Sequence, residues 1–423
     1  MSYPSKLDLF LDVNMPHLEE LIAQLGKDIG LRDKRQIKGL RLLLCNLYIQ
    51  GDRQIFVSRR KQSLGTKKYN PLDIGYRSII SSVDALDEAG YILQKKGSYD
   101  EGKQTTIEPT DNLREWFKWT GWSNAAIDKK VGTYITLRKK DKVKGKPVYI
   151  DFEDTDYSRW LSNEIRQYDR LLNNTEIVLN SIHGIPERVF KRFTVQRKFI
   201  NHSFKDLVDG EFAFGGRIPG PWSNLASEDR ARITLNGEPT IELDRTASHI
   251  NAMYQVITGA PYENGDPYHL IVDNYLVPRH IVKNFSSFMQ GSISLQGASK
   301  SVINSYKREA LEVKEPKEKD IKQYEEYLEF KKKVPPLTII NAFLDKHPKV
   351  RDYYNRGKAW GDFIPCWESD IVFEVIMELT KRGIPCLTVY DSFIVPLKHK
   401  EYVDSIKDIT PYVNRRGSNF RVT

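Results

Sequence analysis

Two aspartates, each beside an apolar β-type segment, place the strongest constraint on how this chain can fold. Asp244 ends the run Thr-Ile-Glu-Leu-Asp and precedes a helix-like stretch from Ser248 to Met253. Asp391 lies between the two apolar runs of residues 384–395, as at the tip of a β-hairpin. A carboxylate among apolar neighbours is unfavourable unless it is paired or binds a cation. Either aspartate alone is more often a turn or cap residue, but the pair predicts a site for cations.

Two facing carboxylates repel each other, and a divalent cation relieves that repulsion. Two Mg²⁺ ions, or Mn²⁺ in their place, held about 3.5–4 Å apart by shared aspartates suit in-line phosphoryl transfer. We therefore expect Asp244 and Asp391 to be the metal ligands and catalytic carboxylates of a two-metal site.

A basic helix is predicted between the two aspartates, from Pro278 to Gly291. Arg279 and Lys283 are four residues apart, so they share one face of that helix. Two cations on one face can grip a triphosphate, and both are therefore candidate nucleotide-binding residues. The competing interpretation is an ordinary basic surface helix.

Residues 1–115 are predicted to form one nucleic-acid-binding domain. Apolar spacing indicates a helix over residues 73–89, and a hairpin is expected from Tyr91 to Thr110. This order resembles a winged helix-turn-helix, whose helix enters the major groove while its hairpin contacts phosphates. Arg77 would then face the groove, and Lys95 and Lys96 the backbone. The alternative is a winged helix that binds only protein.

Positive charge is concentrated in the same domain. The whole chain has 65 basic and 56 acidic residues, a net charge of +9. Residues 32–68 alone hold eleven basic and two acidic residues, a surplus as large as that of the whole chain. Clustered positive charge favours a polyanion partner, nucleic acid first, over a merely solvated face. The candidate contacts within this cluster are Arg59, Arg60, Lys61, Lys67 and Lys68.

Other features narrow the class of protein. The three cysteines include no CxxC pair and exclude a disulfide scaffold. No apolar run approaches the roughly 20 residues of a membrane span, so no membrane partner is expected. The first residues lack the apolar core of a signal peptide, and a cytoplasmic location is expected. A long helix is predicted over residues 157–179, within a helical connector.

The order of segments from about residue 190 to 423 resembles the palm and fingers of two related families. These are the family A DNA polymerases and the phage-type single-subunit RNA polymerases. Leu243-Asp244 with the following Ser248-His-Ile-Asn-Ala-Met resembles their motif A, and Tyr390-Asp391-Ser392 resembles motif C. Arg279 and Lys283 resemble the cations of motif B. Gly216-Arg217 with Ser223-Asn224-Leu225 resembles an upstream segment that touches the template–primer backbone.

The resemblance implies a role for each matched residue. Asp244 and Asp391 would bind both metal ions. Arg279 and Lys283 would contact the incoming nucleoside triphosphate, and Lys283 would also protonate the leaving pyrophosphate. Arg217 and Asn224 would contact the nucleic-acid backbone.

This sequence departs from the family pattern at three places. Tyr390 replaces the usual His of motif C, and Gly291 stands where both families place a tyrosine important for sugar selection. His249 occupies the position, five residues after Asp244, where the DNA enzymes have Glu and the RNA enzymes Gly. The bulk of His249, which would lie near the sugar, favours deoxynucleotides, whereas Ser392 favours ribonucleotides.

Together these observations predict an α+β protein with three parts. They are a winged-helix domain at 1–115, a helical, thumb-like connector at 116–190, and a palm and fingers domain at 191–423 with an antiparallel palm sheet. The expected activity is two-metal extension of a nucleic-acid 3′ end, by a compact DNA polymerase of a phage or mobile element. The alternatives are a single-subunit RNA polymerase, a replication initiator or regulator with an inert palm, and a metal nuclease. The expected partners are a DNA or RNA template–primer and nucleoside triphosphates.

Overall fold

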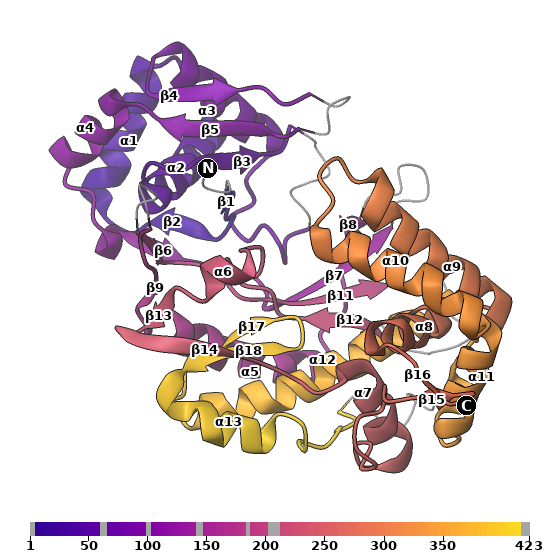
Figure 1. Ribbon diagram of the computed structural model, residues 1–423. Coiled ribbons are helices and arrows are strands. Elements are labelled where there is room, and N and C mark those ends of the chain that lie inside the picture. The colour runs from indigo at the N-terminus through magenta and orange to yellow at the C-terminus, as the bar shows by residue number, and fades with distance from the viewer. Residues whose placement is uncertain are drawn as a thin grey trace. The chain divides into compact units, whose positions relative to one another are not determined.

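The computed structural model describes residues 5–59, 66–98, 103–140, 147–182, 187–201 and 212–415. The fold is α+β, with several small sheets in place of one large one (Figure 1). The chain divides into two compact units. The N-terminal unit comprises Met1–Lys198 and Ile218–Thr240, and the C-terminal unit comprises Phe199–Arg217 and Ile241–Thr423.

The N-terminal unit alternates short strands with helices. Its elements are β1 (Ser5–Lys6), β2 (Leu11–Val13), α1 (Pro16–Asp28), α2 (Lys34–Gln50), β3 (Ile55–Val57), α3 (Tyr76–Glu88), β4 (Ile92–Lys95), β5 (Thr105–Pro109), α4 (Asp111–Trp119), β6 (Ile127–Lys129), β7 (Ile135–Lys140), β8 (Pro147–Tyr149), α5 (Asp156–Asn173), β9 (Ile177–Leu179), β10 (Arg188–Phe190), α6 (Ser227–Arg230) and β13 (Ile233–Leu235). Two further strands, β11 (Arg197–Asn201) and β14 (Glu238–Asp244), begin in this unit and end in the other.

Helices α2 and α3 contribute many residues to one hydrophobic core of the N-terminal unit. A capping box between Asp33 and Gln36 fixes the start of α2, because each satisfies a free backbone N–H. Gly39 lets the two helices approach closely, since a Cβ there would lie 2.7 Å from the backbone of Ser78. Leu40, Leu43 and Val83 are among the fully buried residues of this core.

The helix and hairpin expected after residue 73 are confirmed. Helix α3 ends at Glu88, two residues before Gly90, and β4 pairs with β5 in antiparallel register, Ile92 opposite Pro109. These strands continue into a four-stranded sheet in the order β1-β3-β5-β4. The helix expected over residues 157–179 is correct only in part, because α5 ends at Asn173 and β9 begins at Ile177.

The C-terminal unit is mostly helical, and its short strands include two antiparallel pairs. Its elements are β12 (Phe214–Arg217), α7 (Ser248–Thr258), β15 (Ile271–Val272), β16 (Tyr275–Leu276), α8 (Arg279–Gly291), α9 (Leu295–Lys307), α10 (Glu318–Lys333), α11 (Pro336–Lys346), α12 (Lys358–Lys381), β17 (Leu387–Val389), β18 (Ser392–Pro396) and α13 (Lys400–Ile406).

Helix α12 runs through the core of this unit and packs against β12, α7 and α8. Trp367 and Ile371 on α12 are buried with Phe285 of α8 and Ile250 of α7. The expected hairpin around Asp391 is confirmed, because β17 and β18 pair with Val389 opposite Ser392. No helix in the described parts of the chain is long and apolar enough to cross a membrane.

Candidate active site

The two acidic segments that the sequence singled out come together in the C-terminal unit. Asp244 is the last residue of β14, and Asp391 lies in the turn between β17 and β18. Strands β14 and β18 are neighbours in one sheet. The Ser392 hydroxyl donates a hydrogen bond to Oδ1 of Asp244, which ties the two segments to each other directly. Asp244 is exposed, so its second oxygen can meet a ligand.

A third carboxylate, Glu368 of α12, stands beside this pair. Its side chain is only 2% exposed. Nη2 of Arg217 lies 3.3 Å from one of its oxygens, and Nε2 of His249 lies 3.4 Å from the other. Burial first, and then the charge of Glu368, raise the pKa of Asp391, and Asp244 acts in the same direction. The site therefore gathers three acids within electrostatic reach of one another.

Arg217 contacts two neighbouring side chains, Glu368 and Tyr390. Besides its contact with Glu368, its guanidinium lies 4.7 Å from the centre of the Tyr390 ring, a cation–π distance. Tyr390 is 57% exposed and adopts a positive φ of 57° at the hairpin turn. The aromatic ring at this position therefore covers the guanidinium on one side. The Arg217 side chain, which was expected to contact nucleic acid, is therefore held beside the acidic cluster.

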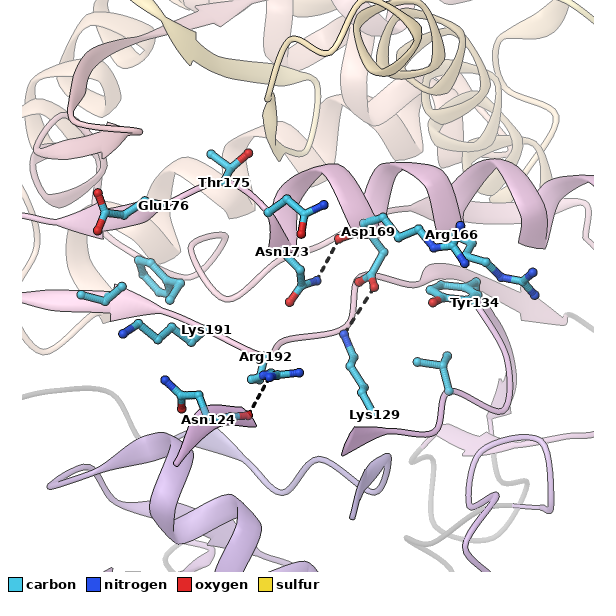
Figure 2. A pocket seen from close by; sticks show the side chains of 15 residues that line it. Asn124, Lys129, Tyr134, Arg166, Asp169, Asn173, Thr175, Glu176, Lys191 and Arg192 are labelled. Carbon is cyan, nitrogen blue, oxygen red and sulfur yellow. Dashed lines mark hydrogen bonds and ion pairs between the residues drawn. The ribbon is translucent and has the colours of Figure 1, made fainter. Parts of the chain in front are cut away.

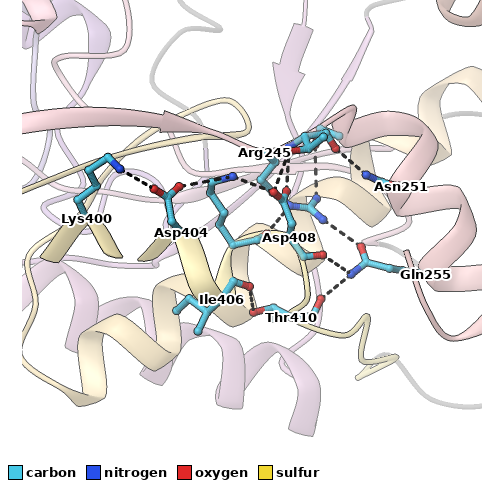
Figure 3. Close-up of polar contacts among 11 residues, drawn as sticks. Arg245, Asn251, Gln255, Lys400, Asp404, Ile406, Asp408 and Thr410 are labelled. Atoms are coloured by element: carbon cyan, nitrogen blue, oxygen red, sulfur yellow. Dashed lines mark hydrogen bonds and ion pairs between the residues drawn. The ribbon is translucent and has the colours of Figure 1, made fainter. Parts of the chain in front are cut away.

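A polar network holds the turn that follows Asp244 (Figure 3). Arg245 is buried, and its guanidinium donates to the Lys407 carbonyl at 2.8 Å and to Oε1 of Gln255 at 3.0 Å. The Asp408 carboxylate accepts from both the backbone N–H and the hydroxyl of Thr246. The segment after α13 therefore fixes the backbone that carries Asp244.

Burial and hydrogen bonding shift the pKa values of two charged groups in this network, Arg245 and Asp408. Burial lowers the pKa of the Arg245 guanidinium, although Glu368, Asp408 and Asp391 oppose the change. Hydrogen bonds from Lys407 and Thr246 outweigh burial and hold the pKa of Asp408 below its ordinary value. Arg245 is therefore a buried guanidinium, held by hydrogen bonds, within electrostatic reach of Glu368 and Asp391.

The two cations of the predicted basic helix differ in their surroundings. Nε of Arg279 lies 2.8 Å from Oδ2 of Asp266, and its guanidinium lies 5.0 Å from the centre of the Tyr268 ring. Lys283, one turn later, is exposed, and no ion pair joins it to another described residue. Burial raises the pKa of Tyr268 to about 12, and the charges of Arg279 and Glu368 both act on that hydroxyl. Tyr268 is therefore in contact with Arg279 and within electrostatic reach of Glu368.

The expected nucleic-acid contacts of the N-terminal unit fall into two groups. Arg59 is ion-paired with Asp84, and Lys68 with Asp154. The remaining described candidates, Lys67, Arg77, Lys95 and Lys96, are exposed, as is Asn224. Arg60 and Lys61 lie outside the described residues.

Sequence reasoning found both aspartates but missed the roles of Glu368 and Arg245. Glu368 looks like an ordinary polar residue on a helix, and its partners Arg217 and His249 are far away in the sequence. The sequence offers one signal for Arg245, which is its position directly after Asp244.

Neither a protein-family model, nor a curated protein, nor a solved structure matches this chain. The geometry of the site therefore carries the functional argument. Within the described residues, no group of three or more His, Cys, Asp or Glu side chains is arranged as a metal cage.

Proposed function

We propose that the C-terminal unit is the catalytic core of a nucleotidyltransferase that extends a nucleic-acid 3′ end. One observation carries the proposal: the strand end with Asp244 and the hairpin tip with Asp391 are joined through Ser392. Two acids from segments about 150 residues apart have no structural need to lie at the ends of neighbouring strands. Active sites commonly gather such mutually unfavourable charges.

The donor set suits Mg²⁺, which prefers carboxylate oxygens and keeps several waters in its shell. Asp244 and Asp391 would hold the ions, and Glu368 would add negative charge from behind. The ions would supply activation of the 3′-hydroxyl and neutralisation of the triphosphate. The clustering of three acids favours this interpretation, since a divalent cation relieves their mutual repulsion.

The basic residues of the unit would handle the nucleotide. Lys283 is exposed and unpaired among the described residues, so it is free to meet a triphosphate. Arg279 would have to leave Asp266 or contact the phosphates with its remaining N–H groups. In this proposal Lys283 donates a proton to the leaving pyrophosphate, because a lysine can give up a proton near neutral pH more readily than an arginine.

A DNA polymerase is favoured over an RNA polymerase. His249 would lie near the sugar, and its contact with Glu368 limits how far its ring can move. A bulky, held side chain there disfavours a 2′-hydroxyl. The RNA polymerase alternative rests on Ser392, the residue type that the RNA enzymes have after the motif C aspartate.

The N-terminal unit would recruit the nucleic acid. Helix α3 and the β4–β5 hairpin have the order of a winged helix, and Arg77, Lys95 and Lys96 on them are exposed. In such a domain these residues would contact the groove and the phosphates. This supports a compact replicative enzyme of a phage or mobile element.

A DNA-binding initiator with an inert palm is the second candidate. It is favoured by the Ser392 hydroxyl that already occupies Oδ1 of Asp244. Incubation of a labelled primer–template with Mg²⁺ and either dNTPs or NTPs tests these candidates. Growth of the primer supports a polymerase, and the better nucleotide assigns the sugar. Shortening of the primer would indicate a nuclease, and an unchanged primer with retained binding would indicate the initiator.

A further inference from the structure

A polar cavity of about 810 Å³ opens in the N-terminal unit, and the proposed function does not use it. Its walls come from α5, from the end of β6, from the start of β7 and from β10 with the residues that follow it. Figure 2 shows Lys129 pointing toward Asp169, with Arg166 and Tyr134 to one side and Lys191 to the other. Cavities of roughly 300–1,000 Å³ are the usual size for small-ligand sites.

The lining is rich in cations. Five of the lining residues are basic, and two, Asp169 and Glu176, are acidic. Nζ of Lys129 lies 3.4 Å from Oδ2 of Asp169, and both side chains are largely buried, so these two charges offset each other. Asp169 also accepts a hydrogen bond from the backbone N–H of Val195 at 2.9 Å. Four further cations therefore face one remaining acid, Glu176.

Those four cations have few internal partners. Arg166, Arg170 and Lys191 are exposed, and no ion pair joins any of them to another described residue. Arg192 donates to the Asn124 carbonyl at 2.6 Å, a neutral partner. Arg166 and Arg170 are one helical turn apart on α5, and like charges at this spacing destabilise a helix unless an anion offsets them.

Tyr134 lies next to Arg166 on one side of the cavity (Figure 2). The Arg166 guanidinium is 5.7 Å from the centre of its ring. Burial and the charge of Asp169 raise the pKa of Tyr134, whereas Arg166 and Arg170 lower it. The Arg166 guanidinium therefore lies over this ring, and the charge of Arg170 acts on the same hydroxyl. Phe190 gives the opposite wall a second aromatic ring.

We propose that this cavity binds a nucleotide by its phosphate groups, either as a free nucleotide or as part of a single nucleic-acid strand. An arginine guanidinium binds phosphate oxygens with two parallel hydrogen bonds, and four cations that face one acid match two or three phosphate charges. The asparagines Asn124 and Asn173 add amide groups at the wall. This site is independent of the acidic cluster in the C-terminal unit.

Binding measurements without a divalent cation test the proposal. The probes are dATP and a fluorescent single-stranded oligothymidylate, titrated in EDTA against the full chain. The test variant is Arg166→Gln/Arg170→Gln. Its matched control is Arg159→Gln, because Arg159 is an exposed arginine of the same helix that pairs with Asp156 and does not line the cavity. Lys191→Gln, on the other wall, is a second test variant.

The double variant should bind at least one probe about tenfold more weakly or worse, and Lys191→Gln should weaken the same probe. The control should stay within about twofold of the unaltered chain. Loss confined to dATP identifies a free nucleotide, and loss confined to the oligothymidylate identifies a strand. Equal binding by all variants, an equal loss in the control, or no binding of either probe by the unaltered chain would overturn the proposal. Asp244→Asn should leave this binding unchanged. Primer extension tests the polymerase proposal separately, so either proposal can fail without the other.

Discussion

His347 is a buried histidine whose two ring nitrogens both have fixed partners. Its Nε2 lies 2.9 Å from the Pro267 carbonyl, which can only accept, so Nε2 carries the proton. Nδ1 then accepts from the Tyr254 hydroxyl at 3.0 Å. A second proton on the ring would force the Tyr254 hydroxyl to turn and accept this hydrogen bond in place of donating it. Burial accordingly lowers the pKa of His347 from 6.5 to about 4.

This histidine makes the stability of the C-terminal unit depend on pH. Between pH 6.5 and about 4 the unfolded chain takes up a proton that the folded chain does not, so the free energy of unfolding falls as the pH falls. The full effect is about 3 kcal/mol, and above pH 6.5 it is absent. His347→Gln should flatten this slope in urea unfolding, whereas exposed His17→Gln should not. An unchanged slope in His347→Gln would contradict the assignment.

Arg279 and Lys283 should affect different steps of nucleotide addition. Lys283→Ala should slow the chemical step roughly a hundredfold, because charge on the leaving pyrophosphate grows toward the transition state. Arg279→Ala should mainly raise the nucleotide KM, since a guanidinium binds phosphates already present in the ground state. Lys283→Arg should restore little of the rate of the chemical step, because arginine does not deprotonate near neutral pH.

Single-turnover kinetics at saturating nucleotide separate these effects. The exposed Lys322→Ala on α10 is the matched control and should leave the rate unchanged. If Lys283→Ala keeps the chemical rate of the unaltered chain, the basic helix is only a surface feature.

At the residue scale, the sequence predicted the acids whose local pattern is unusual and missed those whose role depends on distant partners. Asp244 and Asp391 interrupt apolar runs, which is visible without a structure. Glu368 sits in a helix where a glutamate is unremarkable, and only the fold brings Arg217 and His249 to it.

At the scale of the elements, the close contact of α2 with α3 depends on one glycine. A Cβ at Gly39 would lie 2.7 Å from both the carbonyl carbon and the oxygen of Ser78, which are backbone atoms that cannot rotate away. Gly39→Ala should lower the free energy of unfolding by about 1–3 kcal/mol, as overpacking usually does.

Chemical denaturation of the full chain measures this change. Gly291→Ala is a control, because a Cβ at that helical glycine would meet nothing within 4 Å. The control should unfold at the same denaturant concentration as the unaltered chain or at a slightly higher one, since alanine favours a helix. If Gly39→Ala is equally harmless, α2 and α3 do not pack as described.

Elements were predicted best where a local signal marks their ends. The stop at Gly90 and the turn before Lys103 defined α3 and the β4–β5 hairpin. The pattern of residues 157–179 carried no such signal. Ile177, Val178 and Leu179 fit a helical spacing, yet they pair as strand β9 with β10, because strand pairing is a long-range preference that periodicity does not reveal.

At the scale of the whole molecule, exposed basic residues should govern how binding to nucleic acid depends on salt. The triple variant Arg77→Gln/Lys95→Gln/Lys96→Gln should bind duplex DNA more weakly. Its plot of log affinity against log salt should be shallower by up to about three, roughly one for each lost phosphate contact. Anisotropy titrations at several salt concentrations measure both quantities.

A matched triple variant controls for net charge. Lys314, Lys317 and Lys322 are exposed in the C-terminal unit, and their replacement by Gln removes the same charge. The control should keep the original slope. Equal slopes in both triple variants would mean that the α3 and hairpin cations do not contact DNA.

The class of fold was predictable, but the course of the chain between its units was not. Composition and alternating patterns indicate an α+β protein. The chain, however, leaves the N-terminal unit after Lys198, returns at Ile218 and leaves again after Thr240. Such exchanges depend on contacts between distant segments, for which a single sequence carries no local signal.

Primer extension by the aspartate variants tests the central claim most directly. The unaltered chain should extend a labelled primer–template in Mg²⁺, and Asp244→Asn and Asp391→Asn should each abolish extension, because an amide lacks the charge that holds the ion. Asp352→Asn, an exposed acid of the same unit, should extend normally. The account is contradicted if the unaltered chain adds no nucleotide, or if either active-site variant keeps near-normal extension.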